Sequence, residues 1–302
     1  MMDIVTDRRP LRRLFAFVSG DGEDFEFGVE SIGTTLLFAR MEKQTRDLIP
    51  EGRFQGYRQA FEEEYTKLEK SAKGSTSHHR IVHYDFGGLR LLVRSAVDAY
   101  IGELAPTLDQ ETSQHSQQDG DEDLVKFIKV TSLGRAAPSI IETPKAPGLT
   151  VIPGGQNVPL SAVTELKTRS KFAKKPFNLT QKMPDLWISQ TQNFIDAAHQ
   201  NVGTKWSRAK YNEPRLAEFM DIDIKPMTED LAEWETENAK TIYSFLIVLR
   251  QIIDTARSME TPCIVRYEKD KDVLLVSKAE SGVVPIQVDV MKEKWFVGPE
   301  PA

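Results

Sequence analysis

Apolar and polar residues alternate in several parts of the chain, and this pattern predicts β-strands. Short apolar runs bounded by glycine and acidic residues indicate three strands near the start, at residues 14–18, 25–27 and 34–39. Longer β-type runs cover residues 79–86 and 89–100, and Gly87-Gly88 between them is typical of a hairpin turn. A further β-type run covers residues 158–168. We expect the runs at 89–100 and 158–168 to lie side by side in one central sheet.

Other segments repeat their apolar residues at steps of three and four, as amphipathic helices do. The predicted helices are 54–72, 184–200 and 228–259. The first two are expected to flank the sheet, and the third, which is the longest, to cover another part of it. A hairpin at 262–268 and 272–277 follows the long helix, and a strand at 283–290 follows the hairpin.

These elements predict an α/β (α+β) fold in which helices flank a central mixed β-sheet, with a long C-terminal helix and a hairpin. We expect one domain over residues 1–302, with its core at about 53–278. Residues 105–157 read as a mobile insertion, because an acidic polar stretch is followed by a stretch rich in proline. A short strand at 126–131 is expected inside this insertion.

Composition limits the class of protein. The chain is 40% hydrophobic and 28% charged, which is typical of a globular protein without membrane segments. Its net charge of −6 argues against indiscriminate binding of nucleic acid, so any such contact must be local. The single cysteine, Cys263, excludes an internal disulfide framework. Asp3 and Asp7 interrupt the arginine-rich start and argue against a transit peptide, so a nuclear or cytosolic location is expected.

An acid at the end of one strand and an acid and a lysine on the next form the main candidate site. Glu165 and Lys167 are two residues apart on a strand, so their side chains share a face. Asp98 and Glu165 are predicted to bind Mg²⁺ or Mn²⁺, because hard cations prefer carboxylate oxygens. Lys167 would orient the attacking water or bind the scissile phosphate. Basic residues that follow suit neighbouring phosphates, namely Arg169, Lys171, Lys174 and Lys175.

Three more residues are candidates. Glu62 follows an inward-facing Phe61 on the first predicted helix and could reach the cation. Gln190 and Gln192 lie on the predicted helix after the Glu-x-Lys strand, where a glutamine can bind a phosphate or a metal-bound water. Simpler explanations stay open for all of these residues. A Glu-x-Lys pair is often a solvent-facing ion pair, Glu62 is equally consistent with an exposed acid, and a glutamine near the core can serve structure alone.

Together these segments resemble the PD-(D/E)xK nuclease superfamily, and within it the eukaryotic RNA 5′-end decapping exonucleases. The matching residues are Glu62 after Gly56-Tyr57 and Phe61, Asp98, the Glu165-Leu-Lys-Thr168 segment, and Gln192, for which Gln190 is the competing choice. The chain is also similar to fungal proteins of this type with Asp-Phe-Gly-Gly and Leu-Trp-x-Ser-Gln-Thr segments. The resemblance implies a nuclease-like fold, a divalent cation on Glu62, Asp98 and Glu165, and RNA as substrate.

Two departures from that family leave a second function open. Position 96 is Ala where the family motif has Glu, so one carboxylate is missing. Asp98 and Glu165 are also 67 residues apart, although a long insertion between neighbouring strands costs little entropy. The first hypothesis is a Mg²⁺-dependent hydrolase that acts on RNA at its 5′ end. The alternative is a catalytically degenerate module that binds RNA or a protein partner.

Overall fold

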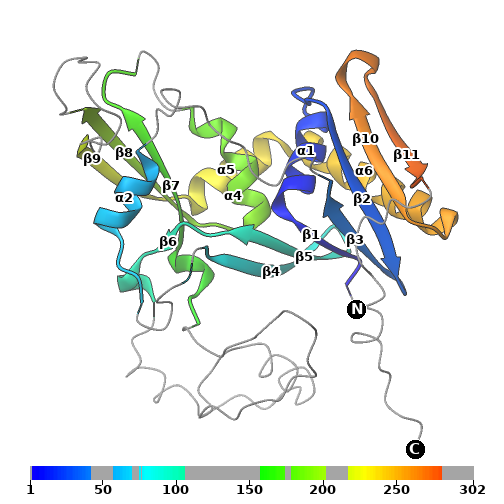
Figure 1. The fold of residues 1–302 in the computed structure, drawn as a ribbon, viewed down its shortest axis with the longest axis horizontal. Coiled ribbons are helices and arrows are strands. Elements are labelled where there is room, and N and C mark those ends of the chain that lie inside the picture. Colours follow the sequence, from blue (N-terminus) through cyan, green and yellow to red (C-terminus); the bar gives the residue numbers. More distant parts are fainter. Residues whose placement is uncertain are drawn as a thin grey trace, which may run out of the picture.

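The computed structural model describes residues 2–41, 57–69, 75, 77–105, 157–173, 178–201 and 217–280. The predicted strands at 126–131 and 283–290 lie outside the described residues, as does nearly all of the expected insertion. Within the described residues the chain forms two mixed sheets with helices between and around them (Figure 1). The predicted class, a mixed α+β fold with a large mixed sheet flanked by helices, is confirmed.

The larger sheet has the strand order β11-β10-β2-β3-β1-β5-β4. Its strand β1 is parallel to both β3 and β5, and the other pairs are antiparallel. In chain order its strands are β1 (Ile4–Asp7), β2 (Phe25–Ile32), β3 (Thr35–Arg40), β4 (His79–Phe86), β5 (Leu89–Ala96), β10 (Cys263–Glu268) and β11 (Val273–Lys278). The β4–β5 turn at Gly87-Gly88 and the β10–β11 hairpin agree with the prediction, and both glycines have positive φ, at 57° and 83°.

The smaller sheet has the order β6-β7-β8-β9, with β7 and β8 parallel. Its strands are β6 (Ala99–Tyr100), β7 (Val163–Ser170), β8 (Asn193–Asn201) and β9 (Ala217–Pro226). Figure 1 shows this sheet and α2 on one side of the molecule and the β2–β10–β11 end of the larger sheet on the other. Between them lie α1, α4 and α5, so the space between the sheets is filled by helices.

An aromatic cluster holds four of the described α-helices together. The described α-helices are α1 (Arg8–Val18), α2 (Arg58–Tyr65), α4 (Met183–Ser189), α5 (Thr228–Glu237) and α6 (Ala239–Met259). The ring of Phe15 on α1 lies 6.2 Å from Trp187 of α4, 5.6 Å from Trp234 of α5 and 5.5 Å from Phe245 of α6. One buried side chain therefore touches three other helices, and α1 is set firmly beside α4.

Several sequence predictions of elements are wrong in part. Residues 14–18, expected as a strand, are the second half of α1, because Leu11, Leu14 and Phe15 recur at helical spacing and are all buried. The helix expected at 54–72 is helical only at Arg58–Tyr65 among its described residues, and Thr66 is already extended. The helix expected at 228–259 is broken at Asn238, whose side-chain amide donates to the carbonyl of Trp234 at 2.8 Å.

The two strands expected side by side lie largely in different sheets. The run at 89–100 is interrupted at Val97-Asp98, so only its last two residues, β6, pair with β7. Residues 160–162 form a 3₁₀ turn before β7 begins. The helix expected at 184–200 ends at Ser189, and the chain from Asn193 onward is β8, because it pairs with β7 on one side and β9 on the other. Tertiary pairing thus overrides the local pattern in both places.

Candidate active site

Strand β7 presents its functional residues on one face and its core residue on the other. Leu166 is fully buried and packs with Phe61 of α2 and Ala197 of β8. Glu165 and Lys167 therefore point to the opposite face, as predicted. Glu165 is 6% exposed, so its carboxylate is nearly removed from water. A charge buried to this extent needs partners, and the structure supplies them.

Asp98 joins the site through the backbone of β7. It lies in the break between β5 and β6, and its Oδ2 accepts a hydrogen bond from the Leu166 N–H at 2.9 Å. Burial, together with the nearby charge of Glu165, raises the pKa of Asp98. The acid of the earlier segment and the Glu-x-Lys strand thus come together, and the break between the two sheets is what brings Asp98 there.

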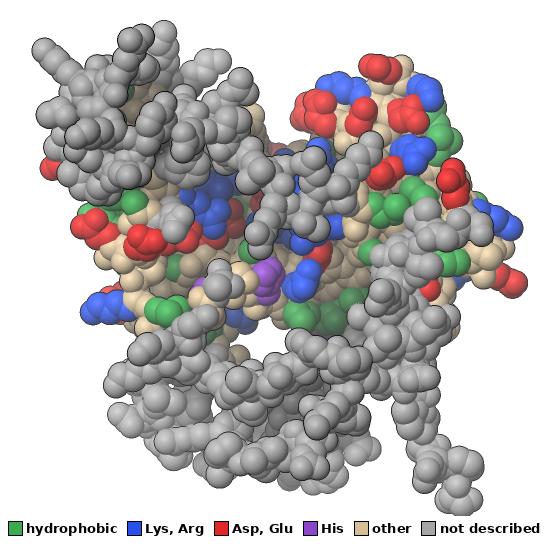
Figure 2. All heavy atoms as spheres, in the orientation of Figure 1, with side chains coloured by type: hydrophobic (Ala, Val, Ile, Leu, Met, Phe, Trp, Pro, Cys, Tyr) green, Lys and Arg blue, Asp and Glu red, His purple; other side chains and the backbone are tan. Residues whose placement is uncertain are grey.

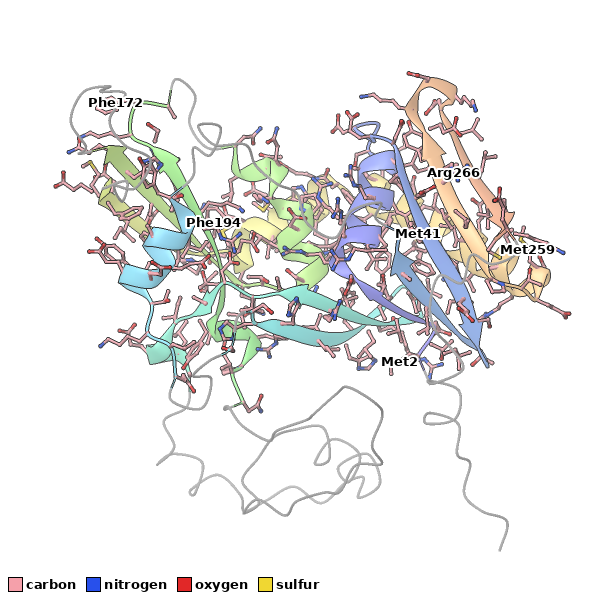
Figure 3. All side chains as sticks on the ribbon, in the orientation of Figure 1. Met2, Met41, Phe172, Phe194, Met259 and Arg266 are labelled. Atoms are coloured by element: carbon pink, nitrogen blue, oxygen red, sulfur yellow. The ribbon has the colours of Figure 1, made fainter. Side chains whose placement is uncertain are left out.

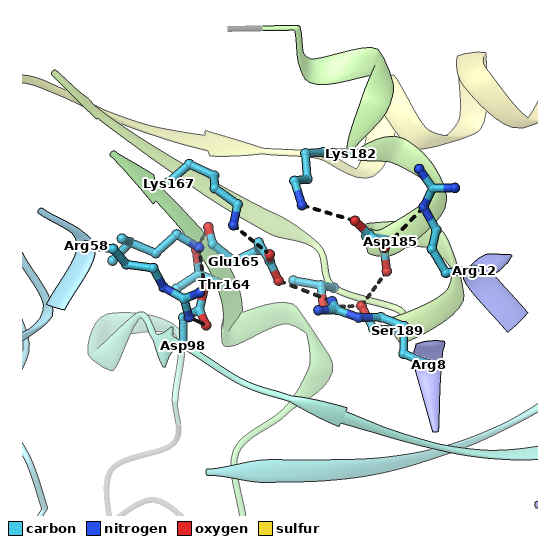
Figure 4. Close-up of polar contacts among 12 residues, drawn as sticks. Arg8, Arg12, Arg58, Asp98, Thr164, Glu165, Lys167, Lys182, Asp185 and Ser189 are labelled. Atoms are coloured by element: carbon cyan, nitrogen blue, oxygen red, sulfur yellow. Dashed lines mark hydrogen bonds and ion pairs between the residues drawn. The ribbon is translucent and has the colours of Figure 1, made fainter. Parts of the chain in front are cut away.

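Arg58 lies close to all three predicted carboxylates, and Figure 4 shows it beside Asp98 and Glu165. It is the first residue of α2, and its Nε donates to Glu62 Oε1 at 2.7 Å, one helical turn further on. Its Nη2 donates to Asp98 Oδ1. Burial lowers the pKa of Arg58, but the charges of Asp98, Glu62 and Glu165 outweigh burial and raise it. One guanidinium is therefore the shared counter-ion of this group, and the sequence analysis had not singled it out.

Glu165 has two cationic partners of its own. Arg8 Nη1 lies 3.2 Å from Glu165 Oε2, and Lys167 Nζ lies 3.7 Å from Glu165 Oε1. Arg8 is the first residue of α1, and Arg12 one turn later lies 3.3 Å from Asp185 of α4. None of these contacts was predicted, because residues 14–18 of α1 were expected to be a strand. The i, i+4 spacing of Arg8 and Arg12 would have placed both on one face of that helix.

The site is electrically divided into two ends (Figure 4). At one end, the acid end, Glu62 and Asp98 share the single cation Arg58. At the other, the basic end, two carboxylates are shared by four cations: Glu165 by Arg8 and Lys167, and Asp185 by Arg12 and Lys182, the last at 3.1 Å. Burial lowers the pKa of Lys167, and the positive charges of Lys182 and Arg58 lower it further. The acid end attracts cations, and the basic end attracts anions.

The donor chemistry of the acid end, together with Glu165 next to it, fits a hard divalent cation, with one condition. Glu62, Asp98 and Glu165 offer carboxylate oxygens, the ligands that Mg²⁺ and Mn²⁺ prefer. In the arrangement observed, no group of three or more His, Cys, Asp or Glu side chains among the described residues is placed so that it could hold a metal ion. The guanidinium of Arg58 separates the carboxylates. The fit therefore depends on Arg58 leaving Asp98.

Of the remaining predicted residues, those that the structure describes have other positions or partners. Arg169 shares the face of Glu165 and Lys167 but donates to Asp196 of β8 at 2.7 Å. The exposed Lys171 follows β7, and Lys174 and Lys175 lie outside the described residues. Figure 2 shows basic side chains gathered on the middle of this face of the molecule, between the smaller sheet and the β10–β11 hairpin.

Both predicted glutamines follow α4 instead of lying on a helix. Gln190 adopts a left-handed conformation at φ 54° and ends α4, with its side-chain amide donating to the Trp187 carbonyl at 2.7 Å. Gln192 and Gln190 line a cavity of about 320 Å³ between β4, α4 and α5. Trp187 and Gln190 line this cavity. Asp185 and Ser189 of α4, which Figure 4 labels, are not among its lining residues. The functional role assigned to the glutamines stays a prediction.

The fold and this arrangement define a class of protein. The chain is similar to the crystal structure of Candida albicans Rai1 in complex with pU5 and Mn²⁺, with a TM-score of 0.52 and 12% sequence identity over 97% of this chain and 71% of that one. It is also similar to Scheffersomyces stipitis Rai1, with a TM-score of 0.51 and 13% identity over 92% and 68%. The chain therefore shares the fold of these Rai1 structures, and the resemblance drawn from the sequence is confirmed at the level of fold.

A family model described as a domain of unknown function, DUF8563, matches residues 1–295. The chain belongs to this family. No curated protein matches the sequence. Within the part of the chain that the structure describes, no helix is long and apolar enough to cross a membrane.

Proposed function

We propose that this protein is a divalent-metal-dependent phosphodiester hydrolase that acts on RNA, at its 5′ end. One observation carries the proposal: Glu62, Asp98, Glu165 and Lys167 come from three separate elements and converge around one guanidinium. A solvent-facing ion pair on a strand would not require Asp98 to be tied to the β7 backbone or Glu165 to be buried. The complex of Candida albicans Rai1 with pU5 and Mn²⁺ supports RNA and a divalent ion as the ligands.

The roles of the residues follow from the two ends of the site. Asp98, Glu165 and Glu62 would hold Mg²⁺ or Mn²⁺, which when bound polarises a phosphoryl oxygen and activates water. Lys167, beside Glu165, orients the attacking water or binds the scissile phosphate. At the basic end, Asp185 is the one acid among the described residues that pairs with Arg12 and Lys182, so the two cations retain positive charge for a phosphate group.

The other predicted RNA contacts extend this site. Arg169 lies on β7, Lys171 follows the strand, and Lys174 and Lys175 come next in the sequence. These four basic residues are proposed to contact neighbouring phosphates. Gln192 or Gln190 is proposed to contact RNA from the cavity on α4, the helix that also carries Asp185 at the basic end.

Lys167→Ala tests the proposal directly. Labelled RNAs with a 5′-monophosphate or a cap are incubated with Mg²⁺ or Mn²⁺, and the products are resolved by length. We expect Lys167→Ala to lower the cleavage rate by about 100-fold or more, as is typical when a charged transition-state contact is removed. The exposed Lys240→Ala on α6 is the matched control and should cleave like the wild type. Equal RNA loss with wild type and Lys167→Ala would contradict the proposal.

A second function, RNA binding without cleavage, is favoured by one residue. Ala96 is the exposed last residue of β5, two positions before Asp98, where the decapping family has a carboxylate. With one acid fewer, the cation would be held less firmly. This function predicts that the wild type binds RNA in a fluorescence anisotropy assay while no product forms with either ion.

A further inference from the structure

Both carboxylate oxygens of Asp98 already accept a hydrogen bond, and one of the two donors is Arg58. One oxygen, Oδ2, accepts from the Leu166 N–H within the smaller sheet at 2.9 Å. That bond is part of the fold, since β7 is paired on both sides. The other oxygen, Oδ1, accepts from Arg58 Nη2, so a cation that binds at Oδ1 competes with Arg58 for that atom.

Arg58 also holds an oxygen of the second acid at this end. Its Nε bonds Glu62 Oε1 at 2.7 Å. Two of the three predicted cation ligands thus each give an oxygen to the same guanidinium, and the third, Glu165, contributes to it through its charge. A divalent cation and Arg58 draw on the same local negative charge of Glu62 and Asp98, so they cannot both be bound there at full strength.

The position of Arg58 makes displacement feasible. Its side chain is 47% exposed, whereas the Asp98 side chain is 5% exposed. The carboxylate is fixed and buried, and the guanidinium reaches it from the solvent side on a flexible stem. Helix α2 itself is held by Phe61, which packs with Leu166 and Ala197. Arg58 can therefore leave Asp98 without moving the helix.

We infer that Arg58 is an intramolecular competitor of the divalent cation, so that metal binding requires its release from Asp98 and Glu62. This inference rests on the proposed function and adds to it a residue that sets the metal affinity of the site. With Arg58 in place the acid end carries two carboxylates and one cation, and without it the described residues give these two carboxylates no other salt-bridge partner. Removing Arg58 should then strengthen metal binding, which is the opposite of removing a ligand.

Calorimetric titration of the full chain with Mn²⁺ tests the inference without any measurement of activity. We expect Arg58→Ala to bind Mn²⁺ about tenfold more tightly than the wild type, within the range of ordinary coupling between two binding events. Arg58→Lys should fall between them, because one ammonium cannot span both carboxylates as the guanidinium does. Thermal unfolding gives a second readout, since Mn²⁺ should raise the Tm of Arg58→Ala more than that of the wild type.

Arg266→Ala is the matched control. Arg266 lies on β10, far from β7 on the other side of the molecule (Figure 3). Its side chain is 50% exposed and pairs with Glu26 at 3.0 Å. Its removal should leave Mn²⁺ affinity unchanged. Arg58→Lys, which keeps the charge at the start of α2, decides the question if Arg58→Ala does not fold.

The outcomes separate the inference from the proposed function. Mn²⁺ affinity that is equal or weaker in both Arg58 variants, with the wild type binding, overturns the inference alone. Mn²⁺ bound by Arg58→Ala but not by the wild type supports the inference and overturns metal-dependent hydrolysis by the native chain. Binding by neither protein overturns both.

Discussion

Single buried charges determine what the site can do. Asp98 is buried next to Glu165, and both burial and that charge raise its pKa, while burial lowers the pKa of Lys167. The pKa values of Asp98 and Lys167 are thus shifted toward each other. Such shifts are common where proton transfer or ion binding takes place. The cluster therefore differs from a surface ion pair, in which water would screen both charges.

His199 provides a prediction about pH that does not depend on the site. It is buried on β8, with its ring 4.6 Å from that of Tyr57 and 6.2 Å from that of Phe219. Burial lowers its pKa below the ordinary value of 6.5. The unfolded chain binds the proton more readily, so the stability that neutral His199 contributes is present above about pH 6.5 and is lost as pH falls.

The variant His199→Phe isolates this effect, because it keeps a ring among aromatic neighbours and cannot take up a proton. We expect the Tm of the wild type, measured relative to that of His199→Phe, to fall as pH is lowered from 7.5 to 5.5. Differential scanning fluorimetry of both proteins across this range checks it. A difference in Tm that does not change with pH would contradict the prediction.

At the scale of elements, short helices place the key side chains. Helix α2 has only eight residues, which is too short to be stable alone, so its position depends on packing. Phe61 is 2% exposed, stacks on Tyr65 at 4.6 Å and meets Phe219 edge-on at 5.0 Å. This packing holds Arg58 and Glu62 next to Asp98.

We expect Phe61→Ala to lower the free energy of unfolding by about 3 kcal/mol, because the ring leaves a cavity that the strands cannot close. Urea denaturation followed by tryptophan fluorescence measures the change. Tyr65→Phe is the control: Tyr65 is 48% exposed, and the loss of its hydroxyl should change stability by less than about 0.5 kcal/mol. If the two variants were equally stable, Phe61 would not be the anchor of α2.

The same scale shows what local sequence can and cannot predict. The Gly87-Gly88 hairpin and the β10–β11 hairpin were predicted because their turns carry their own signals. Helix α1 was missed because five consecutive apolar and aromatic residues, Leu14–Val18, read equally well as a strand. Strand β8 was assigned to a helix because its pairing with β7 and β9 involves residues far along the chain. Because α1 was not predicted, Arg8 and Arg12 were not expected at the site.

For the whole molecule, the sequence indicated the Asp98, Glu165 and Lys167 grouping through the spacing of short motifs. It did not reveal that the chain forms two sheets, since the break at Val97-Asp98 carries no glycine or proline. Phe194, which faces the same side as Glu165 on the neighbouring strand, belongs to the core shared with α1 and α4 (Figure 3). The site thus lies where the smaller sheet meets the helices of the larger one, and that junction is a property of the complete fold.

The charge of the whole chain and that of the basic end make opposite contributions to RNA binding. The net charge of −6 repels RNA at long range, whereas Arg8, Arg12, Lys167 and Lys182 attract phosphates at the site.

If these four cations supply the phosphate contacts, log K against log[salt] should have a slope of about −3 for single-stranded RNA. The double variant Arg12→Ala/Lys182→Ala should reduce the slope by about 1.4. Anisotropy titrations in KCl measure both slopes, with Lys240→Ala as the control. An unchanged slope in the double variant would mean that Arg12 and Lys182 neutralise no phosphates, and the RNA would then bind to another surface.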